Sequence, residues 1–203
     1  MASCSKIAAN ILYACANMVA GIKDIAYFIN IDDVDKTTST FDPENPLLLT
    51  QLVLLTTSPV ARAFTVEGHN YSNEHDTALV KGVYYNSWEH NFRFRIFDNS
   101  PEVKLWINTA VGSRFLIIQE NNYSNTDSPA GRTVFEVLGW DFGLEVKEAV
   151  RVAADAELAG GWNILAACSE KLKESKPPLA FFVGGSISAT RAAIAALVEG
   201  AIP

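Results

Sequence analysis

Hydrophobic and polar residues alternate along much of this 203-residue chain with the two-residue period of β-strands. In the clearest case Phe92, Phe94 and Ile96 alternate with Arg93 and Arg95. Successive side chains of a strand point to opposite faces, so this segment is expected to bury one face and expose the other. Other segments rich in β-branched and aromatic residues also predict strands, at 22–31, 47–58, 60–68, 115–121, 133–152, 162–170 and 179–183.

Two of these segments leave alternatives open. The apolar run at 47–58 fits a strand buried on both faces, but periodicity alone does not distinguish it from a helix. Segment 133–152 fits either one long strand or a pair of strands. An acidic turn and the strand at 162–170 follow it, so a long hairpin is predicted over about 133–169.

One segment carries the full set of helix signals. Asn99 or Ser100 can cap its first turn, and Pro101 suits its first position. Five apolar residues have the spacing of one buried face: Val103, Trp106, Ile107, Ala110 and Val111. Gly112 offers the left-handed conformation that ends many helices. The pattern therefore predicts a helix over about 100–111.

The two ends of the chain are predicted to carry further helices. Segment 7–19 predicts a short amphipathic helix, and an alanine-rich segment predicts a second one at about 187–199. The length and the absence of a low-complexity insert favour a single domain over 1–203. Within that domain, 1–20 and 186–203 are candidate extensions between subunits.

Composition favours a protein that associates with itself. The chain is 49% hydrophobic and only 19% charged, which suffices for a real core and leaves less charge than usual for the surface. The net charge of −7 and the scattered basic residues argue against a nucleic-acid-binding surface. The apolar start of the chain is interrupted by polar residues and predicts neither a signal peptide nor a membrane span. We therefore expect a protein made and kept in the cytoplasm.

Three cysteines, Cys4, Cys15 and Cys168, are too few and too far apart for a zinc framework or a CxxC pair. Their odd number fits a reducing compartment. No GxSxG elbow occurs, and no cysteine lies near a histidine in a known catalytic context. We therefore expect no enzymatic activity and no cofactor.

Three clusters have some of the composition of a binding site, but ordinary structure explains each of them better. His69, Glu74, His75 and Asp76 have the composition of a metal site, but their spacing matches no such pattern and favours a solvated loop. The aspartates Asp32, Asp33 and Asp35 lack the glycine and distal glutamate of an EF-hand. The glycines before Ser186 have no phosphate-binding motif around them and favour a helix start.

The segment LGWDFGLEVK, at 138–147, is the main candidate for a functional surface. Its apolar positions share one period: Leu138, Trp140, Phe142, Leu144 and Val146. The intervening positions are Gly139, Asp141, Gly143, Glu145 and Lys147. This alternation predicts a strand, whose paired glycines suggest close approach by another backbone. We expect that backbone to belong to a neighbouring subunit, with Asp155 and Glu157 of the acidic turn as further contacts. Gly139→Val is then expected to impair assembly more than folding.

Two segments carry a resemblance to a known family: RFRIFDNSPEVKLWINTAVGSRFLIIQENN and GRTVFEVLGWDFGLEVKEAVRVAADAELAGGWNILAACS. Their order of elements resembles the bacteriophage tail-tube family, including tail proteins predicted in phages of Bacteroidota. Tubes of contractile injection systems and type VI secretion share this fold in outline. The resemblance implies a mainly β (α+β) fold: an antiparallel β-sandwich or small barrel, flanked by the helix at about 100–111. The hairpin at about 133–169 and the helix at about 187–199 complete it.

The resemblance implies a non-enzymatic virion structural protein. Its subunits would form rings, commonly hexameric, that stack into a tail tube conducting DNA. Its partners would be further copies of itself and other tail or connector proteins, with DNA as passing cargo and no membrane. It would belong to the virion tail and assemble in the host cytoplasm.

Two alternatives to the tail tube stay open. One is a head–tail connector or tail terminator ring. The other is a β-sandwich module that binds carbohydrate through Tyr84, Tyr85 and Trp88, although ordinary strand packing also explains these aromatic residues.

Overall fold

The computed structural model describes residues 21–55, 61–69, 72–83, 85–122, 134–156 and 159–200. Its fold is mainly β (α+β), as predicted, and the described residues include two α-helices. The elements are β1 (Ile22–Asn30), η1 (Ile31–Asp33), β2 (Thr40–Asp42), β3 (Asn45–Gln51), β4 (Phe64–Glu67), β5 (Glu74–Lys81), β6 (Asn86–Ile96), α1 (Pro101–Ala110), β7 (Arg114–Asn121), β8 (Phe135–Leu138), β9 (Leu144–Arg151), β10 (Trp162–Ala167), β11 (Leu179–Phe181) and α2 (Ile187–Glu199). The predicted helix at 7–19 lies outside the described residues.

A single folded sheet connects the strands in the order β2-β3-β11-β8-β7-β9-β10-β6-β5, with β1 pairing to both β7 and β4. β7 is buried on both faces. Its Leu116 and Ile118 enter one hydrophobic core, and its Phe115 and Ile117 enter another. The nearly continuous apolar sequence of β7 is therefore explained by its position between two cores.

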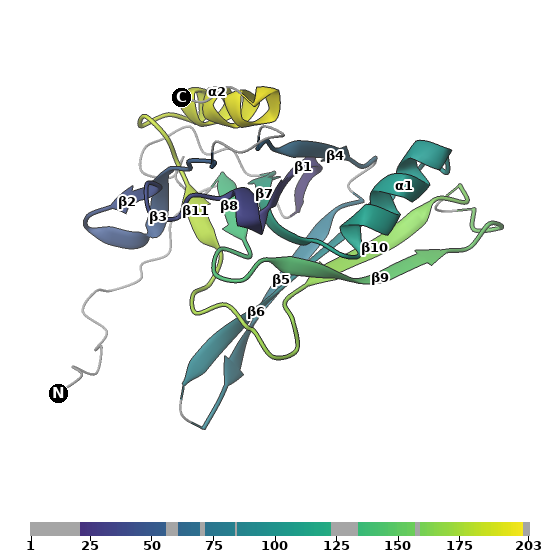
Figure 1. Ribbon diagram of the computed structural model, residues 1–203, viewed down its shortest axis with the longest axis horizontal. Coiled ribbons are helices and arrows are strands. Elements are labelled where there is room, and N and C mark those ends of the chain that lie inside the picture. The colour runs from purple at the N-terminus through teal and green to yellow at the C-terminus, as the bar shows by residue number, and fades with distance from the viewer. Residues whose placement is uncertain are drawn as a thin grey trace.

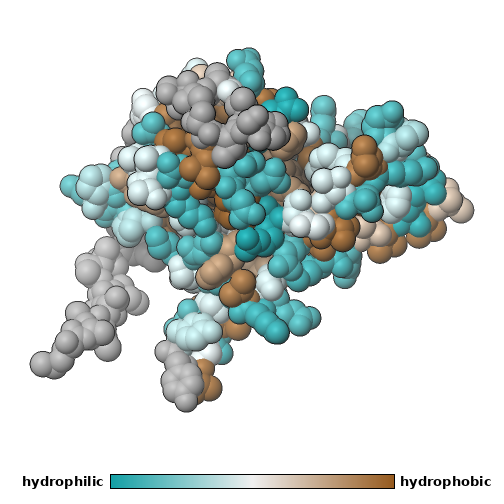
Figure 2. All heavy atoms as spheres, viewed as in Figure 1, coloured by the Kyte–Doolittle hydropathy of each residue, from teal (hydrophilic) through white to brown (hydrophobic). Residues whose placement is uncertain are grey.

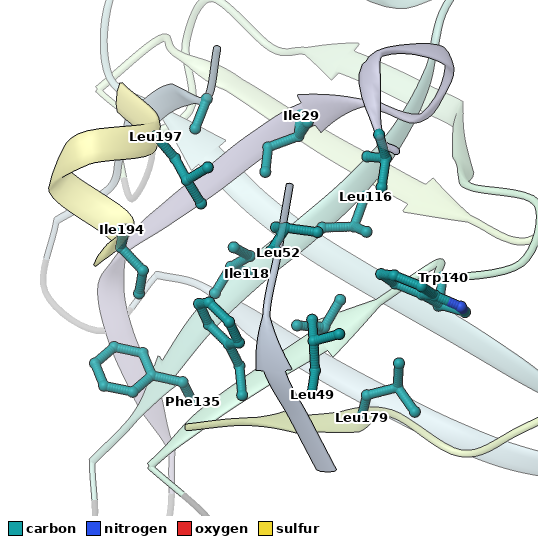
Figure 3. Packing of buried hydrophobic residues seen from close by; sticks show 14 of the residues in the cluster. Ile29, Leu49, Leu52, Leu116, Ile118, Phe135, Trp140, Leu179, Ile194 and Leu197 are labelled. Atoms are coloured by element: carbon teal, nitrogen blue, oxygen red, sulfur yellow. The ribbon is translucent and has the colours of Figure 1, made fainter. Parts of the chain in front are cut away.

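The first core lies under α2 and the strands β2, β3 and β11 (Figure 3). Ile194 and Leu197 of α2 point from the helix into this core, and Trp140 closes its far side. Ser186 caps α2 by accepting a hydrogen bond from the Ala189 amide at 3.0 Å, and Gly200 ends the helix in the left-handed conformation. The predicted C-terminal helix is confirmed.

The second core lies between β1 and β7 on one side and β6, β9, β10 and α1 on the other. Phe28 lies at its centre, fully buried. Four rings contact the Phe28 ring edge-on, with centroids 5.1 to 6.0 Å away: Phe92, Phe94, Trp106 and Phe115. This aromatic cluster attaches α1 and the outer strands to the centre of the molecule.

Helix α1 confirms the prediction of a helix over about 100–111, but two details of its last turn differ. The Ser100 hydroxyl accepts a hydrogen bond from the Val103 amide at 3.3 Å, and Ile107 and Ala110 are buried. Val111, predicted to be buried, is 57% exposed. Gly112 does not adopt a positive φ. After the helix, the amides of Gly112 and Ser113 donate hydrogen bonds to carbonyls three residues earlier, a 3-10-type ending that needs no left-handed residue.

Three other sequence predictions are corrected by the fold. β3 and β11 pair in parallel, so the sheet is mixed and not purely antiparallel. In the described part of the apolar run, 47–55, β3 is the only strand, and Leu47 in β3 is exposed, so this part is not buried on both faces. The polar segment 69–76, predicted to be a loop, contributes Glu74, His75 and Asp76 to β5, because pairing with β6 overrides its turn-forming composition.

Candidate subunit interface

The segment 138–147 forms a tight turn between two strands and not a single strand. β8 ends at Leu138 and β9 begins at Leu144. Gly139 and Gly143 bound the turn with φ of +74° and +78°, and the Gly143 amide donates to the Gly139 carbonyl at 3.1 Å. The prediction of one strand is therefore wrong, while the alternative of a strand pair is confirmed.

Both glycines are approached closely by other parts of the same chain. A Cβ on Gly139 would lie 2.9 Å from the carbonyl oxygen of Phe115 and 3.1 Å from the Leu144 nitrogen. A Cβ on Gly143 would lie 3.0 Å from Cβ of Arg114. The neighbouring backbone predicted for Gly139 exists, but it is β7 of the same chain. The glycines therefore give no evidence for a contact between subunits.

The alternating apolar residues of this segment do not share one face. Leu138 and Leu144 belong to the second core, Trp140 belongs to the first, and Phe142 is 37% exposed. The core assignment is thus right for Trp140 and wrong for Phe142. Apolar and polar residues still alternate in the sequence of the five-residue turn. Because the turn is not a strand, its apolar side chains point in different directions.

A buried glutamate holds the turn in place. The carboxylate of Glu174 accepts hydrogen bonds from the amides of Asp141 at 2.6 Å and Phe142 at 3.0 Å. Glu174 is almost fully buried, and this burial raises its pKa. Sequence analysis missed this residue because it lies in a lysine-rich segment that has the composition of a linker.

Asp141, a predicted subunit contact, binds two other loops of its own chain. Its carboxylate accepts hydrogen bonds from the amide and the hydroxyl of Ser175, at 2.7 and 2.5 Å. Its backbone carbonyl accepts a hydrogen bond from Lys36 Nζ at 2.8 Å. These bonds join the turn to two loops that are remote in sequence, which gives Asp141 a structural role in the monomer.

His90 completes this network beneath the turn. The Gly139 amide donates to His90 Nδ1 at 3.3 Å, so Nε2 carries the proton and donates to the Lys176 carbonyl at 3.1 Å. Burial lowers the pKa of His90 to about 4. The Cys168 thiol accepts a hydrogen bond from the His90 amide at 3.3 Å, and burial raises its pKa. A buried neutral thiol is a poor nucleophile.

Acid is expected to destabilise the fold through His90. The folded pKa of about 4 lies below the ordinary 6.5, so the unfolded chain takes up the proton first as pH falls. The stabilisation is complete above pH 6.5 and is lost between 6.5 and 4, by roughly 3 kcal/mol. Urea titrations at several pH values measure this slope. Glu174 acts in the opposite direction, since its raised pKa favours the fold at low pH.

The variant His90→Gln is the control for this prediction. It removes the titrating group, so its free energy of unfolding should depend less steeply on pH between 6.5 and 4, whatever its absolute stability. Equal slopes for the two proteins would show that His90 does not carry the pH dependence.

Two predicted contact residues, Glu145 and Lys147, lie on β9 and form an ion pair with each other at 2.7 Å. Asp155 lies in the turn between β9 and β10, and Glu157 lies outside the described residues. The predicted subunit-contact residues therefore fall into two groups. Those in the turn after β8 contact other parts of their own chain, and the others belong to the β9–β10 hairpin, which extends from the body (Figure 1). Their contact with another subunit stays a prediction.

The hairpin strands belong to a four-stranded layer with the order β9-β10-β6-β5, in which every neighbouring pair is antiparallel. Within the described ranges, β5 pairs only with β6, and β9 pairs with β7 only through Leu144 and Glu145. Both outer strands of the layer therefore present open hydrogen-bonding edges. Such edges are natural sites of pairing with another chain.

The two faces of the four-stranded layer differ in chemistry. One face contributes buried residues to the second core, among them Phe92, Phe94, Ile164 and Ala166. The other face carries polar contacts between neighbouring strands: Asp76 with Asn91 at 2.8 Å, and Arg93 with Glu148 at 3.8 Å. The layer thus presents a charged, hydrogen-bonding surface on the side away from the core.

The candidate metal clusters have other contacts in the structure. Gln119 Nε2 donates to His75 Nδ1 at 2.7 Å, and the His69 ring lies edge-on to Phe97. The Asp35 carboxylate accepts from the amides of Thr37 and Thr38, an ordinary turn contact. In the part of the chain that the structure describes, no three His, Cys, Asp or Glu residues are grouped as a metal site would require.

The aromatic residues suggested for carbohydrate binding are only partly described. Tyr84 lies outside the described residues, Tyr85 is exposed at the start of β6, and Trp88 is half-buried. The backbone of Trp88 pairs with Glu174, so this residue is part of the network around the turn. Strand packing therefore accounts for Trp88, and Tyr85 is left as an exposed aromatic side chain.

Comparison with known proteins adds no relative. The chain matches no protein-family model, no curated protein and no solved structure. None of the described helices is long and apolar enough to cross a membrane. The function is therefore inferred from the layer and its edges.

Proposed function

We propose that the chain is a virion structural protein that assembles into rings through the open edges of β5 and β9. Stacked rings would form a phage tail tube that conducts DNA. The observation that carries this proposal is the four-stranded layer, in which, among the described residues, the outer side of β5 has no strand partner and that of β9 is paired only at Leu144 and Glu145.

The strand directions suit a closed ring. An even number of antiparallel strands makes β5 and β9 run in opposite directions. In copies related by rotation about a ring axis, β5 of one copy would therefore meet β9 of the next as an antiparallel pair. Two different surfaces joined head to tail generate a ring when the rotation closes, and closure would cover the outer edges of β5 and β9 in every copy.

The charge of the layer suits a channel for DNA. Its strands carry the acids Glu74, Asp76, Glu89, Glu145 and Glu148. The bases in the same strands are Lys81, Arg93, Arg95, Lys147 and Arg151. The numbers of acidic and basic residues in these strands nearly balance, and the whole chain has a net charge of −7. The layer therefore has no row of basic residues that would bind DNA phosphates. A lumen lined by such a surface would let DNA slide past.

A connector or terminator ring is the second candidate, because open edges equally support one ring that does not stack. Electron microscopy of the purified protein at rising concentration separates the two, since a tube protein forms stacks of fixed diameter. A persistent monomer would contradict both.

Two adjacent proline variants in β5, Ala78→Pro and Leu79→Pro, test the edge directly. Neighbouring residues of an edge strand direct their amides alternately toward the sheet and away from it. One of the two prolines therefore removes a backbone hydrogen bond from β5 to β6. The other removes only an amide that could pair with a strand of another copy. We expect one of the two to keep the wild-type melting temperature and yet lose ring formation in sedimentation velocity.

The second proline serves as the matched control, because it should lower the melting temperature by removing a bond within the chain. If the thermally unaffected variant still assembles into rings, β5 is not a subunit edge, and the ring proposal in this form fails.

A further inference from the structure

An apolar groove of about 360 Å³ lies between α1 and the strands β1 and β4. Its floor includes Trp106 and Phe115, and Leu105 stands at its side with 67% of its surface exposed. Among the described residues that line it, Glu102 is the only charged one. The groove is thus an open hydrophobic surface with one negative charge.

The tip of the β5–β6 hairpin has the complementary character. The hairpin projects from the body at the lower end of the molecule (Figure 1), where hydrophobic surface is visible (Figure 2). Val83 is 92% exposed and Tyr85 is 73% exposed. Lys81 is the only charged residue between 77 and 88. The hairpin tip, described at 79–83 and 85–86, therefore combines exposed apolar side chains with one positive charge.

The tip cannot reach the groove of its own chain. β6 begins at the tip and runs for 11 residues, about 37 Å, before the chain enters α1 four residues later. The tip and the groove therefore lie near opposite ends of the same strand (Figure 1). A second copy displaced along the strand direction would place its tip where the first copy has its groove.

We propose that the hairpin tip of one copy docks into the α1 groove of a copy in the next ring. This inference rests on the proposed ring assembly and names the contact that stacks the rings. Tyr85 and Val83 would fill the groove beside Leu105, and Lys81 would pair with Glu102. The contact joins two different surfaces, the tip of one copy and the groove of the next. When the copies are related by translation alone, such contacts form an open-ended array, so rings can add to the tube indefinitely.

Charge reversal and its rescue test the docking. Lys81→Glu and Glu102→Lys, each alone, place like charges together and should shorten tubes at least tenfold in micrographs. Glu102→Lys lies on α1, outside the proposed ring edge, and should leave rings intact. The double variant restores opposite charges and should recover most of the wild-type tube length. Lys171→Glu, at an exposed lysine elsewhere, is the matched control and should leave tube length unchanged.

The apolar part is tested by Leu105→Asp, with Leu172→Asp as the control at another exposed leucine. Only the first should abolish stacking, and sedimentation velocity should then show single rings. Unchanged stacking in Leu105→Asp, or single reversals that the double variant does not rescue, would overturn the docking alone. A wild-type protein that forms no rings would overturn the ring proposal itself.

Discussion

Gly139→Val is expected to lower the free energy of unfolding by roughly 2–5 kcal/mol. Gly139 has a φ of +74°, where a residue with a side chain loses about 1–2 kcal/mol. A Cβ there would meet the Phe115 carbonyl at 2.9 Å, and forcing extra atoms into a packed interior costs about 1–3 kcal/mol more. Urea denaturation followed by circular dichroism measures the change.

Gly185→Val is the matched control. Gly185 has nearly the same φ, +72°, but a Cβ added there would have no atom within 4 Å. This variant should lose only the backbone part, about 1–2 kcal/mol. Equal losses in the two variants would show that the close approach of β7 to Gly139 contributes nothing.

A large loss of stability in Gly139→Val would contradict the prediction from the sequence. That prediction is that the substitution impairs assembly more than folding. Because the crowding partners Phe115 and Leu144 belong to the same chain, unfolding should come first. Tests of assembly therefore belong at the edge of β5 and at the hairpin tip, where substitutions leave the cores intact.

Phe28→Ala is expected to cost roughly 4–5 kcal/mol, near the upper limit for a buried phenylalanine. Phe28 is fully buried and contacts four aromatic rings edge-on, and each such pair contributes about 0.5–1.5 kcal/mol beyond area burial. The cavity would also detach α1 from the outer strands, since Trp106 packs on this ring. Thermal and urea unfolding measure the loss.

Tyr85→Ala is the control for this aromatic deletion. Its side chain is mostly exposed at the hairpin tip, so the free energy of unfolding should change by less than about 0.5 kcal/mol. The same variant should shorten tubes if the tip stacks rings. A loss below about 2 kcal/mol for Phe28→Ala would mean that the second core closes around the cavity, and the cluster would not be the anchor of α1.

Local sequence determined most of the elements of this protein. Alternation placed β6, apolar runs placed β1 and β7, and the Ser100–Pro101 pair placed the start of α1. These signals act over a few residues, so they are legible without knowing what packs against them.

The tertiary structure alone decided the role of the segment at 138–147. Its alternation continues through the turn between Gly139 and Gly143, so periodicity could not reveal that the strand is interrupted there before the chain continues along β7 in the same direction. Glu174 and His90, which hold that turn, come from segments 33 and 49 residues away in sequence. A buried carboxylate or a neutral imidazole has its role only through such distant partners. The open edges of β5 and β9 were likewise decided by the order of the strands in the sheet, because no strand's own residues specify which neighbour it lacks.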